Sequence, residues 1–440
     1  MLDETLLDDP DALARVDRRG LLRGAAEAGA RVRTAARHAA EAGVTELNPE
    51  GRPRSILVAG PGTAAAGVAD MVATLAGASA PVARLHSTGV AAAAGALRWA
   101  LPGWAGSVDL LLITTTDGSE PGLALLAEQA YRRGVTVVAV VPKRSPLAEA
   151  VSGTHGLVVP MAVAPHELTD EEAQEASPAA LWALFTPLLA LLDRMGLVTA
   201  PADTLQRVAD RLDRTAERCG PGVATYSNPA KTLAAELADT LPLIWTEGAA
   251  AAPIGRRFAA VLAELAGRPA FAAELPEALA AHRGLLAGAF ARGADPDDFF
   301  RDRVDEAQAL HARVVLLRDR PTGGLTAAPA ARELALSHDT TISELEPRDP
   351  AADEGPATGN GTSTGNDATN GEGATAGSGT ATGNGTATGN GTATGNGTAT
   401  GDPGTTRDGT TDLECFAELL AITDFAAVYL ALTSRRNTTT

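Results

Sequence analysis

Aromatic residues are scarce in this 440-residue chain: they make up 3% of it, while hydrophobic residues as a whole make up 45%. Ala, Leu and Val must therefore form most of the core, which suits helices packed on sheets. Cysteine is represented only by Cys219 and Cys415, whose separation gives no metal-binding or redox spacing. The length allows two or three domains, and the cysteine usage favours a reducing cytoplasm.

Basic residues are also few relative to acidic ones, and the net charge is −18. Nucleic acid and anionic membrane surfaces both require a basic face, so neither is expected as a partner. The first residues, Met1-Leu2-Asp3-Glu4, are acidic where a signal peptide would be basic. The apolar run Ala179–Leu192 is too short to span a bilayer and contains Pro187, so it predicts a buried core or interface helix.

Continuous apolar runs alternate with helical stretches in the first half of the chain. They are Ser55–Ala59, Val108–Thr114, Val135–Val141 and Gly156–Pro160. Runs that are apolar on both faces indicate parallel strands covered by helices on both sides. This half therefore predicts a doubly wound α/β lobe.

A second group of shorter runs follows a helical stretch from about 177 to 218. The runs at 241–246, 270–273 and 314–317 are separated by helices and predict a second α/β lobe. Before the first lobe, residues 11–43 have helical spacing that Gly43 closes.

The last quarter of the chain changes character. Residues 350–411 are rich in Gly, Thr, Asn and Ala, with a Gly-Asn-Gly-Thr-Ala-Thr hexad repeated from Gly383 to Thr400. Such a segment has almost nothing apolar to bury and predicts a disordered linker. The amphipathic helix expected at Leu413–Leu432 should dock back on the body. The expected divisions are a helical segment, two lobes, a linker and a terminal helix: 1–50, 51–196, 197–335, 336–411 and 412–440.

Two loops that follow expected strands have the composition of phosphate-binding loops. Gly60-Pro61-Gly62-Thr63 enters a helix, where backbone N–H groups can face an anion. Thr114-Thr115-Thr116-Asp117-Gly118-Ser119 clusters hydroxyls before a second helix. A sterically required glycine turn and ordinary N-capping are the respective alternatives. The expected phosphate-binding residues are Gly62, Thr63, Thr114, Thr116 and Ser119.

The most informative stretch lies in the second half. Asn228-Pro229-Ala230-Lys231-Thr232-Leu233-Ala234 indicates a turn and a helix start, and Leu241–Gly248 indicates a strand that ends in a loop. With Leu275-Pro276-Glu277 and Asp424–Leu432, this stretch resembles the bifunctional phosphoglucose/phosphomannose isomerases, which are two-lobed sugar isomerase (SIS) domain proteins. The resemblance covers roughly residues 20–320 and 412–433. It implies two SIS-like lobes with mostly parallel sheets, the second completed by the terminal helix.

The resemblance also implies catalytic positions. Glu264 falls on the family's catalytic glutamate, and a carboxylate suits the transfer of a proton between C1 and C2 of an aldose. The family's ring-opening histidine falls on Ala280, so the candidate for that role is His282, two residues further on, which could reach the substrate only if the loop shifts. Without the resemblance, Glu264 would be a solvated helix residue and His282 an exposed histidine.

Several loop positions depart from the family pattern, so the chain resembles a divergent member. Thr63 and Ala64 stand where the family has glycine and serine, and Asp117 stands where it has glycine. The family's lysine after the terminal helix has no counterpart.

The sequence thus predicts a cytoplasmic phosphosugar isomerase of the glucose-6-phosphate/mannose-6-phosphate type. A homodimer is expected, with a sugar phosphate as ligand and with neither a metal nor an organic cofactor. The alternative is a regulatory protein that binds a sugar phosphate without turning it over. A sugar-responsive transcription factor is disfavoured, because no basic helix-turn-helix module is evident.

Overall fold

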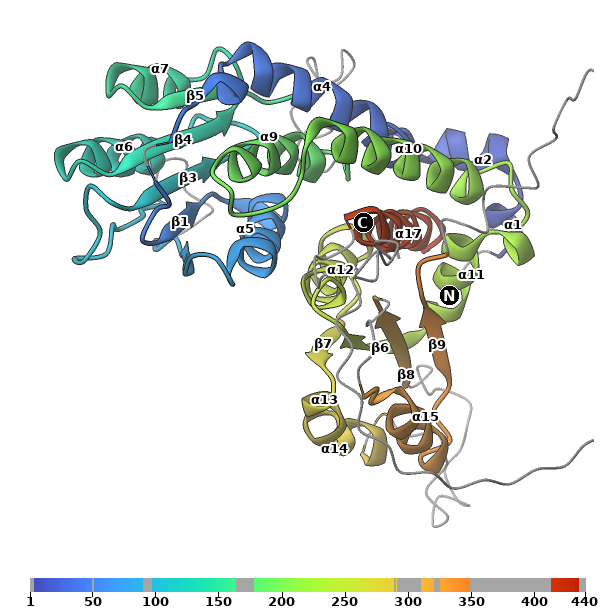
Figure 1. Cartoon of the computed structure of the whole chain (residues 1–440). Coiled ribbons are helices and arrows are strands. Elements are labelled where there is room, and N and C mark those ends of the chain that lie inside the picture. The colour runs from blue at the N-terminus through green and yellow to red at the C-terminus, as the bar shows by residue number, and fades with distance from the viewer. Residues whose placement is uncertain are drawn as a thin grey trace, which may run out of the picture. The chain divides into compact units, whose positions relative to one another are not determined.

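The structure, a computed structural model, describes residues 4–49, 51–89, 97–163, 178–288, 290, 310–319, 325–348 and 413–434. The segment expected to be a disordered linker, 350–411, lies outside these residues. Two parallel sheets with flanking helices form the described part (Figure 1). The predicted α/β class with two mostly parallel sheets is confirmed.

The first sheet has the strand order β2-β1-β3-β4-β5, and all of its strands are parallel. Its strands are β1 Ile56–Ala59, β2 Val82–Leu85, β3 Leu110–Thr114, β4 Thr136–Val141 and β5 Leu157–Pro160. The central strands β1 and β3 are buried throughout, as their unbroken apolar runs require. The edge strand β2 is mostly half-buried or exposed, and no apolar run in the sequence predicted it.

Helices cover both faces of the first sheet, which makes the lobe doubly wound (Figure 1). Alternate residues of β1 belong to two different cores: Ile56 and Val58 to one, Leu57 and Ala59 to the other. The helices of this lobe are α5 Gly62–Ala76, α6 Pro121–Arg132, α7 Pro146–Gly153 and α9 Ala180–Arg194.

The second sheet has the order β7-β6-β8-β9 and is also parallel. Its strands are β6 Thr240–Glu247, β7 Phe271–Glu274, β8 His311–Arg318 and β9 Ile342–Leu345. Strand β9 lies beyond residue 335, where the sequence placed the end of the lobe, because Ile-Ser-Glu-Leu is too short and polar to be recognised as a strand. Its helices are α11 Pro229–Leu237, α12 Ala251–Ala266, α13 Glu277–Ala281, α14 Arg283–Ala287 and α15 Ala328–Ser337.

The N-terminal stretch forms several helices instead of one. They are α1 Glu4–Leu7, α2 Pro10–Val16, α3 Leu21–Ala26 and α4 Ala28–Glu41, followed by the short 3₁₀ turn η1 Val44–Glu46. The break between α2 and α3 falls at Gly20, whose φ of 65° is left-handed. Gly43 ends α4 with φ 84°, as a terminating glycine should.

The apolar helix α9 is buried inside the chain. From Ala180 to Leu192 every residue but Ala190 is buried, and α9 packs against α4 and α5. The run that was predicted to be a buried core or interface helix is therefore a core helix. None of its faces is free to form a subunit interface. After it, α10 Ala202–Cys219 leads to the 3₁₀ turn η3 Thr225–Ser227 and the second lobe.

The terminal helix α17, Leu413–Thr433, packs on α10, α11 and α12 (Figure 1). It was expected to be amphipathic, but it is buried on all sides, with Glu414, Ala431 and Leu432 only half-buried. It is also the one helix among the described residues that is long and apolar enough to cross a membrane. Because 89% of that window is buried within the fold, α17 is placed as a core helix.

Candidate functional site

The loops after β1 and β3 meet at the point where the strand order of the first sheet reverses. The chain leaves β1 for β2 on one side and returns to β3 on the other. At such a switch point the two loops diverge and leave a crevice at the carboxyl ends of the strands. Gly60 fits there because a Cβ on it would lie 2.0 Å from the carbonyl oxygen of Thr114.

Thr114, the last residue of β3, has a buried hydroxyl without a partner. Its side chain is fully buried, and Oγ1 has no hydrogen-bond partner within the described part of the chain. Glu120, six residues on in the same loop, likewise has a buried Oε2 without a partner among these residues. Buried polar atoms are nearly always paired, so two unpaired ones in one loop indicate a place for a polar ligand.

Two helices begin at this switch point without a side-chain cap. The N-cap residues are Pro61 for α5 and Glu120 for α6, and neither side chain bonds the first amides. Gly62 opens α5 with φ 78°. The first N–H groups of a helix have no intrahelical partner and carry the positive end of its dipole, so they can bind an anion.

The rest of the second loop is held by its own hydrogen bonds. Thr115 Oγ1 accepts from the amides of Asp117 at 3.3 Å and Gly118 at 3.2 Å. The Gly118 carbonyl accepts from the Leu147 amide at 3.1 Å, which fastens the loop to α7. Ser119 donates to the carboxylate of Asp117, so its hydroxyl would have to exchange partners to bind a phosphate.

The corresponding switch point of the second sheet is occupied by carboxylates of the chain itself. Asp319, just after β8, accepts from the Ala250 amide before α12 at 2.7 Å. Gly248 is required beside it, since a Cβ there would lie 1.5 Å from Asp319 Oδ1. Glu247, at the end of β6, accepts from the Ala327 amide before α15 at 2.5 Å and from Arg318 Nε at 2.8 Å.

These two carboxylates have shifted pKa values. Burial raises the pKa of Asp319 above its ordinary value, against the lowering effect of the amides of Ala250 and Ala251, and nearby Glu247 raises it further. Burial also opposes ionisation of Glu247, but Arg318, the Ala327 amide and Thr326 together lower its pKa. Sequence reasoning missed both residues, and the only signal for them was the strand end at Gly248.

The two expected catalytic residues lie in the second lobe. Glu264 is exposed on the last turn of α12. His282 is buried and follows α13, where its Nδ1 accepts from Trp245 Nε1 of β6 at 2.9 Å. Burial lowers the pKa of His282, so the neutral ring carries its proton on Nε2. Within the described residues, no interaction joins Glu264 or His282 to the loops of the first switch point.

Lys231 has a structural role in the stretch that carries most of the resemblance. Asn228 caps α11 by accepting from the amides of Ala230 and Lys231 at 3.1 and 3.0 Å. The Lys231 ammonium donates to the carbonyls of Pro221 and Val223, each at 2.8 Å, and burial lowers its pKa. As for metals, the described residues contain no group of three or more His, Cys, Asp or Glu side chains that could hold one.

Comparison with known proteins supports the class that the fold defines. Residues 226–352 match the family model of the bacterial phospho-glucose isomerase C-terminal SIS domain. This stretch contains β6 to β9, so the second lobe is similar to that SIS domain, which confirms the resemblance found in the sequence. No curated protein matches the chain.

Solved structures with a similar arrangement include three from bacteria. A glucose-6-phosphate isomerase like protein from Thermus thermophilus is 16% identical, with 97% of this chain and 92% of that one covered and a TM-score of 0.46. The C-terminal domain of glucosamine-fructose-6-phosphate aminotransferase from Francisella tularensis is 12% identical, with coverage of 94% and 95% and a TM-score of 0.44. A hypothetical protein from Thermus thermophilus is 14% identical, with coverage of 78% and 83% and a TM-score of 0.48.

Proposed function

We propose that this protein binds a phosphosugar at the first switch point and isomerises it between aldose and ketose forms. The observation that carries the binding step is the buried Thr114 hydroxyl, which has no partner among the described residues and lies close to two uncapped helix starts. Gly62, Thr63, Thr114, Thr116 and Ser119 would hold the phosphate through N–H and O–H donors. Glu120 Oε2 would accept from a sugar hydroxyl.

The proposed reaction converts glucose-6-phosphate or mannose-6-phosphate to fructose-6-phosphate. Glu264 would remove the proton from C2 of the open-chain aldose and return it to C1 through a cis-enediol. His282 has its Nδ1 occupied by Trp245, so in ring opening it could only donate its Nε2 proton to the ring oxygen. No metal or cofactor is needed for this proton transfer.

A second candidate function is binding without turnover, as in a regulatory protein. It is favoured by Ala280 at the position of the family's ring-opening histidine and by the lack, among the described residues, of any interaction between Glu264 and the loops of the first switch point. Both functions share the phosphate site, and only the isomerase requires a base.

A coupled assay of fructose-6-phosphate formation from both aldose phosphates tests the reaction. Glu264→Gln should abolish any activity and leave the affinity for fructose-6-phosphate nearly unchanged. Glu277→Gln, the same substitution on α13, is the control. Full activity in Glu264→Gln would exclude this base. Tight binding with no turnover in the wild type would establish the second function.

The expected homodimer also remains a proposal. Because α9 is used inside the chain, the interface must involve another surface. Light scattering at micromolar concentration gives the mass, and a monomer would refute the expectation.

A further inference from the structure

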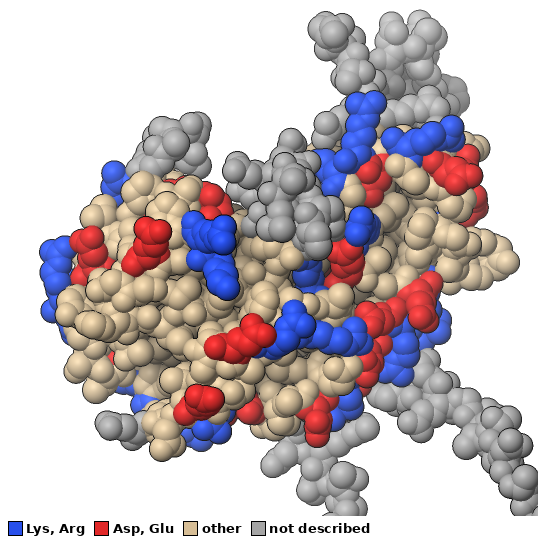
Figure 2. Space-filling model, turned by 90° about the horizontal axis from the view of Figure 1, so that it is seen from above, with Lys and Arg blue, Asp and Glu red and all other residues tan. Residues whose placement is uncertain are grey.

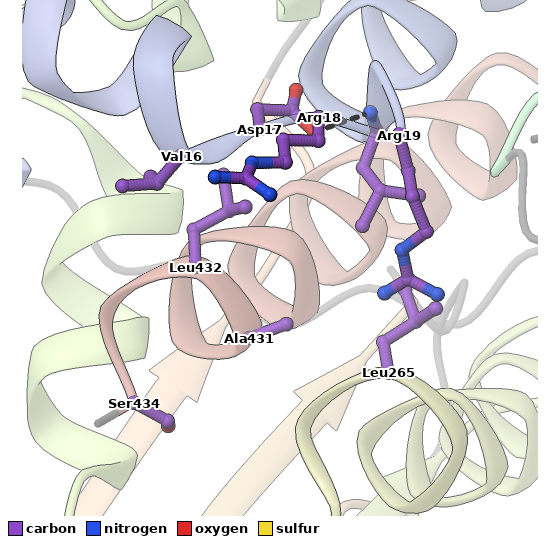
Figure 3. Close-up of a pocket in the computed structure, with 9 residues that line it drawn as sticks. Val16, Asp17, Arg18, Arg19, Leu265, Ala431, Leu432 and Ser434 are labelled. Carbon is purple, nitrogen blue, oxygen red and sulfur yellow. Dashed lines mark hydrogen bonds between the residues drawn. The ribbon is translucent and has the colours of Figure 1, made fainter. Parts of the chain in front are cut away.

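A cavity of about 410 Å³ lies away from both switch points, between the α2–α3 turn and the last turns of α12 and α17 (Figure 3). Its walls are about half apolar and half polar. Val16 and Leu21 come from the ends of α2 and α3, and Leu265 and Leu432 come from α12 and α17. A space of this size is within the range of small-molecule sites and exceeds what a bare inorganic ion needs.

Two arginines, Arg18 and Arg19, form the polar part of the cavity wall. In Figure 3 the side chain of Arg18 extends toward Leu432, and that of Arg19 extends toward Leu265. Within the described ranges neither guanidinium has a hydrogen-bond or ion-pair partner. A guanidinium offers five N–H donors in a planar fork that matches phosphate oxygens.

The acidic residue of the wall does not neutralise these arginines by an ion pair. Asp17 is the only carboxylate among the described lining residues, and both of its oxygens accept from backbone amides at the start of α3. Oδ1 accepts from Leu21 N at 2.8 Å, and Oδ2 accepts from Leu22 N at 2.9 Å. The α2–α3 turn thus uses the Asp17 carboxylate for its own backbone hydrogen bonds. The side chains of Arg18 and Arg19 extend into the cavity.

The surrounding charge gives no general attraction for anions. The chain carries a net charge of −18, and acidic and basic side chains are interspersed on the face seen in Figure 2. The ends of α12 and α17, which bring the negative ends of their dipoles to the cavity, partly offset the arginines. Anion binding here must therefore come from direct contact with Arg18 and Arg19 and should depend strongly on geometry.

We propose that this cavity is a second ligand site, distinct from the first switch point, for a phosphate ester with a compact, partly apolar organic body. Arg18 and Arg19 bind the phosphate group, and Val16, Leu21, Leu265 and Leu432 contact the body. Hydroxyl or amino groups on the body would suit the helix ends. The site joins α12 to α17, so a bound ligand would brace the terminal helix against the second lobe.

The test is isothermal titration calorimetry of the full chain, with fructose-6-phosphate and AMP as separate probes and inorganic phosphate for comparison. The background is Thr114→Val/Ser119→Ala, so that binding at the first switch point is weakened and the remaining signal reports the cavity. Arg18→Ala/Arg19→Ala in this background should weaken organic phosphate binding by at least about tenfold, because it removes the charge-assisted hydrogen bonds to the phosphate group. Inorganic phosphate should bind more weakly than the esters.

Arg15→Ala/Arg37→Ala is the matched control, because it removes the same charge from exposed arginines outside the cavity. It should leave the binding unchanged. Equal binding in the Arg18/Arg19 variant and in the control would overturn the proposal, as would no binding of either ester in the Thr114/Ser119 background. If the alanine variant fails to fold, Arg18→Gln/Arg19→Gln takes its place. Failure of the phosphosugar site would instead appear as identical titrations with and without the Thr114/Ser119 substitutions.

Discussion

Arg211 of α10 and Glu418 of α17 form a buried ion pair, with Arg211 Nε 2.9 Å from Glu418 Oε2 and the two side chains 1% and 0% exposed. Arg218 adds a second contact at 2.8 Å. A second buried carboxylate on α17, Asp424, lies 3.1 Å from Arg257 of α12. Apolar contacts alone would let α17 shift along its groove. The two ion pairs fix one register of α17, because any other register would leave charges buried and unpaired.

Glu418→Gln should therefore destabilise the protein strongly. It removes the negative charge that faces the buried Arg211, and breaking such a buried pair costs about 3–5 kcal/mol. Glu414→Gln is the control, because Glu414 pairs with Arg207, whose side chain is 56% exposed, and such pairs contribute at most about 1 kcal/mol. Urea unfolding measures both. Similar losses in the two variants would show that the buried pair does not fix α17.

Thr114→Val should separate stability from binding. It removes a buried hydroxyl that has no partner within the described structure, so the free protein should unfold at an equal or higher temperature. The same change should weaken phosphosugar binding by about tenfold or more. Thr186→Val on α9 is the matched control, because its hydroxyl is also buried and unpartnered among the described residues. If both variants bind the phosphosugar as the wild type does, Thr114 does not contact the ligand.

His282 should make stability depend on pH. Its folded pKa lies below the ordinary value of 6.5, so the unfolded chain takes up the proton first as the pH falls. The stabilising contribution is complete above about pH 6.5 and is lost as the pH falls through the folded pKa. His282→Gln can still accept from Trp245 but cannot titrate. Its free energy of unfolding relative to that of the wild type should therefore increase as the pH falls from about 7.5 to about 5. Parallel stability curves for the two proteins would contradict this, and the exposed His311→Gln serves as control.

Asp319→Ala should convert the second switch point into an anion site. The substitution leaves the Ala250 amide without its acceptor, at a cost of about 1–3 kcal/mol, and uncovers the start of α12. Added phosphate should then raise the melting temperature of Asp319→Ala more than that of the wild type. Asp319→Asn retains an acceptor and should behave like the wild type. An equal phosphate response in all three proteins would refute the internal capping role.

The sequence predicted the parts of the fold that depend on local pattern. The buried runs of β1, β3 and β4, the glycine that ends α4 and the Asn228 cap could all be recognised from neighbouring residues. Strands β2 and β9 were missed because their residues alternate or are polar, and they are strands by virtue of pairing with β1 and β8. The contact of Asp319 with Ala250 spans 69 positions and that of Glu418 with Arg211 spans 207, so no local pattern reveals them. The burial of His282 against Trp245 was likewise not predicted: the sequence offered His282 only as a candidate for ring opening or as an exposed histidine.

The late position of α17 in the chain has a consequence for biosynthesis. The groove on α10, α11 and α12 is complete in sequence by residue 266, yet its occupant begins at Leu413. At roughly 5–20 residues per second, the 167 residues from 267 to 433 take roughly 8–33 seconds to synthesise. During that interval the nascent protein presents an apolar groove whose arginines Arg211, Arg218 and Arg257 have not yet met the carboxylates of Glu418 and Asp424. We expect a chaperone that recognises apolar surface to act during this interval, before α17 has been synthesised.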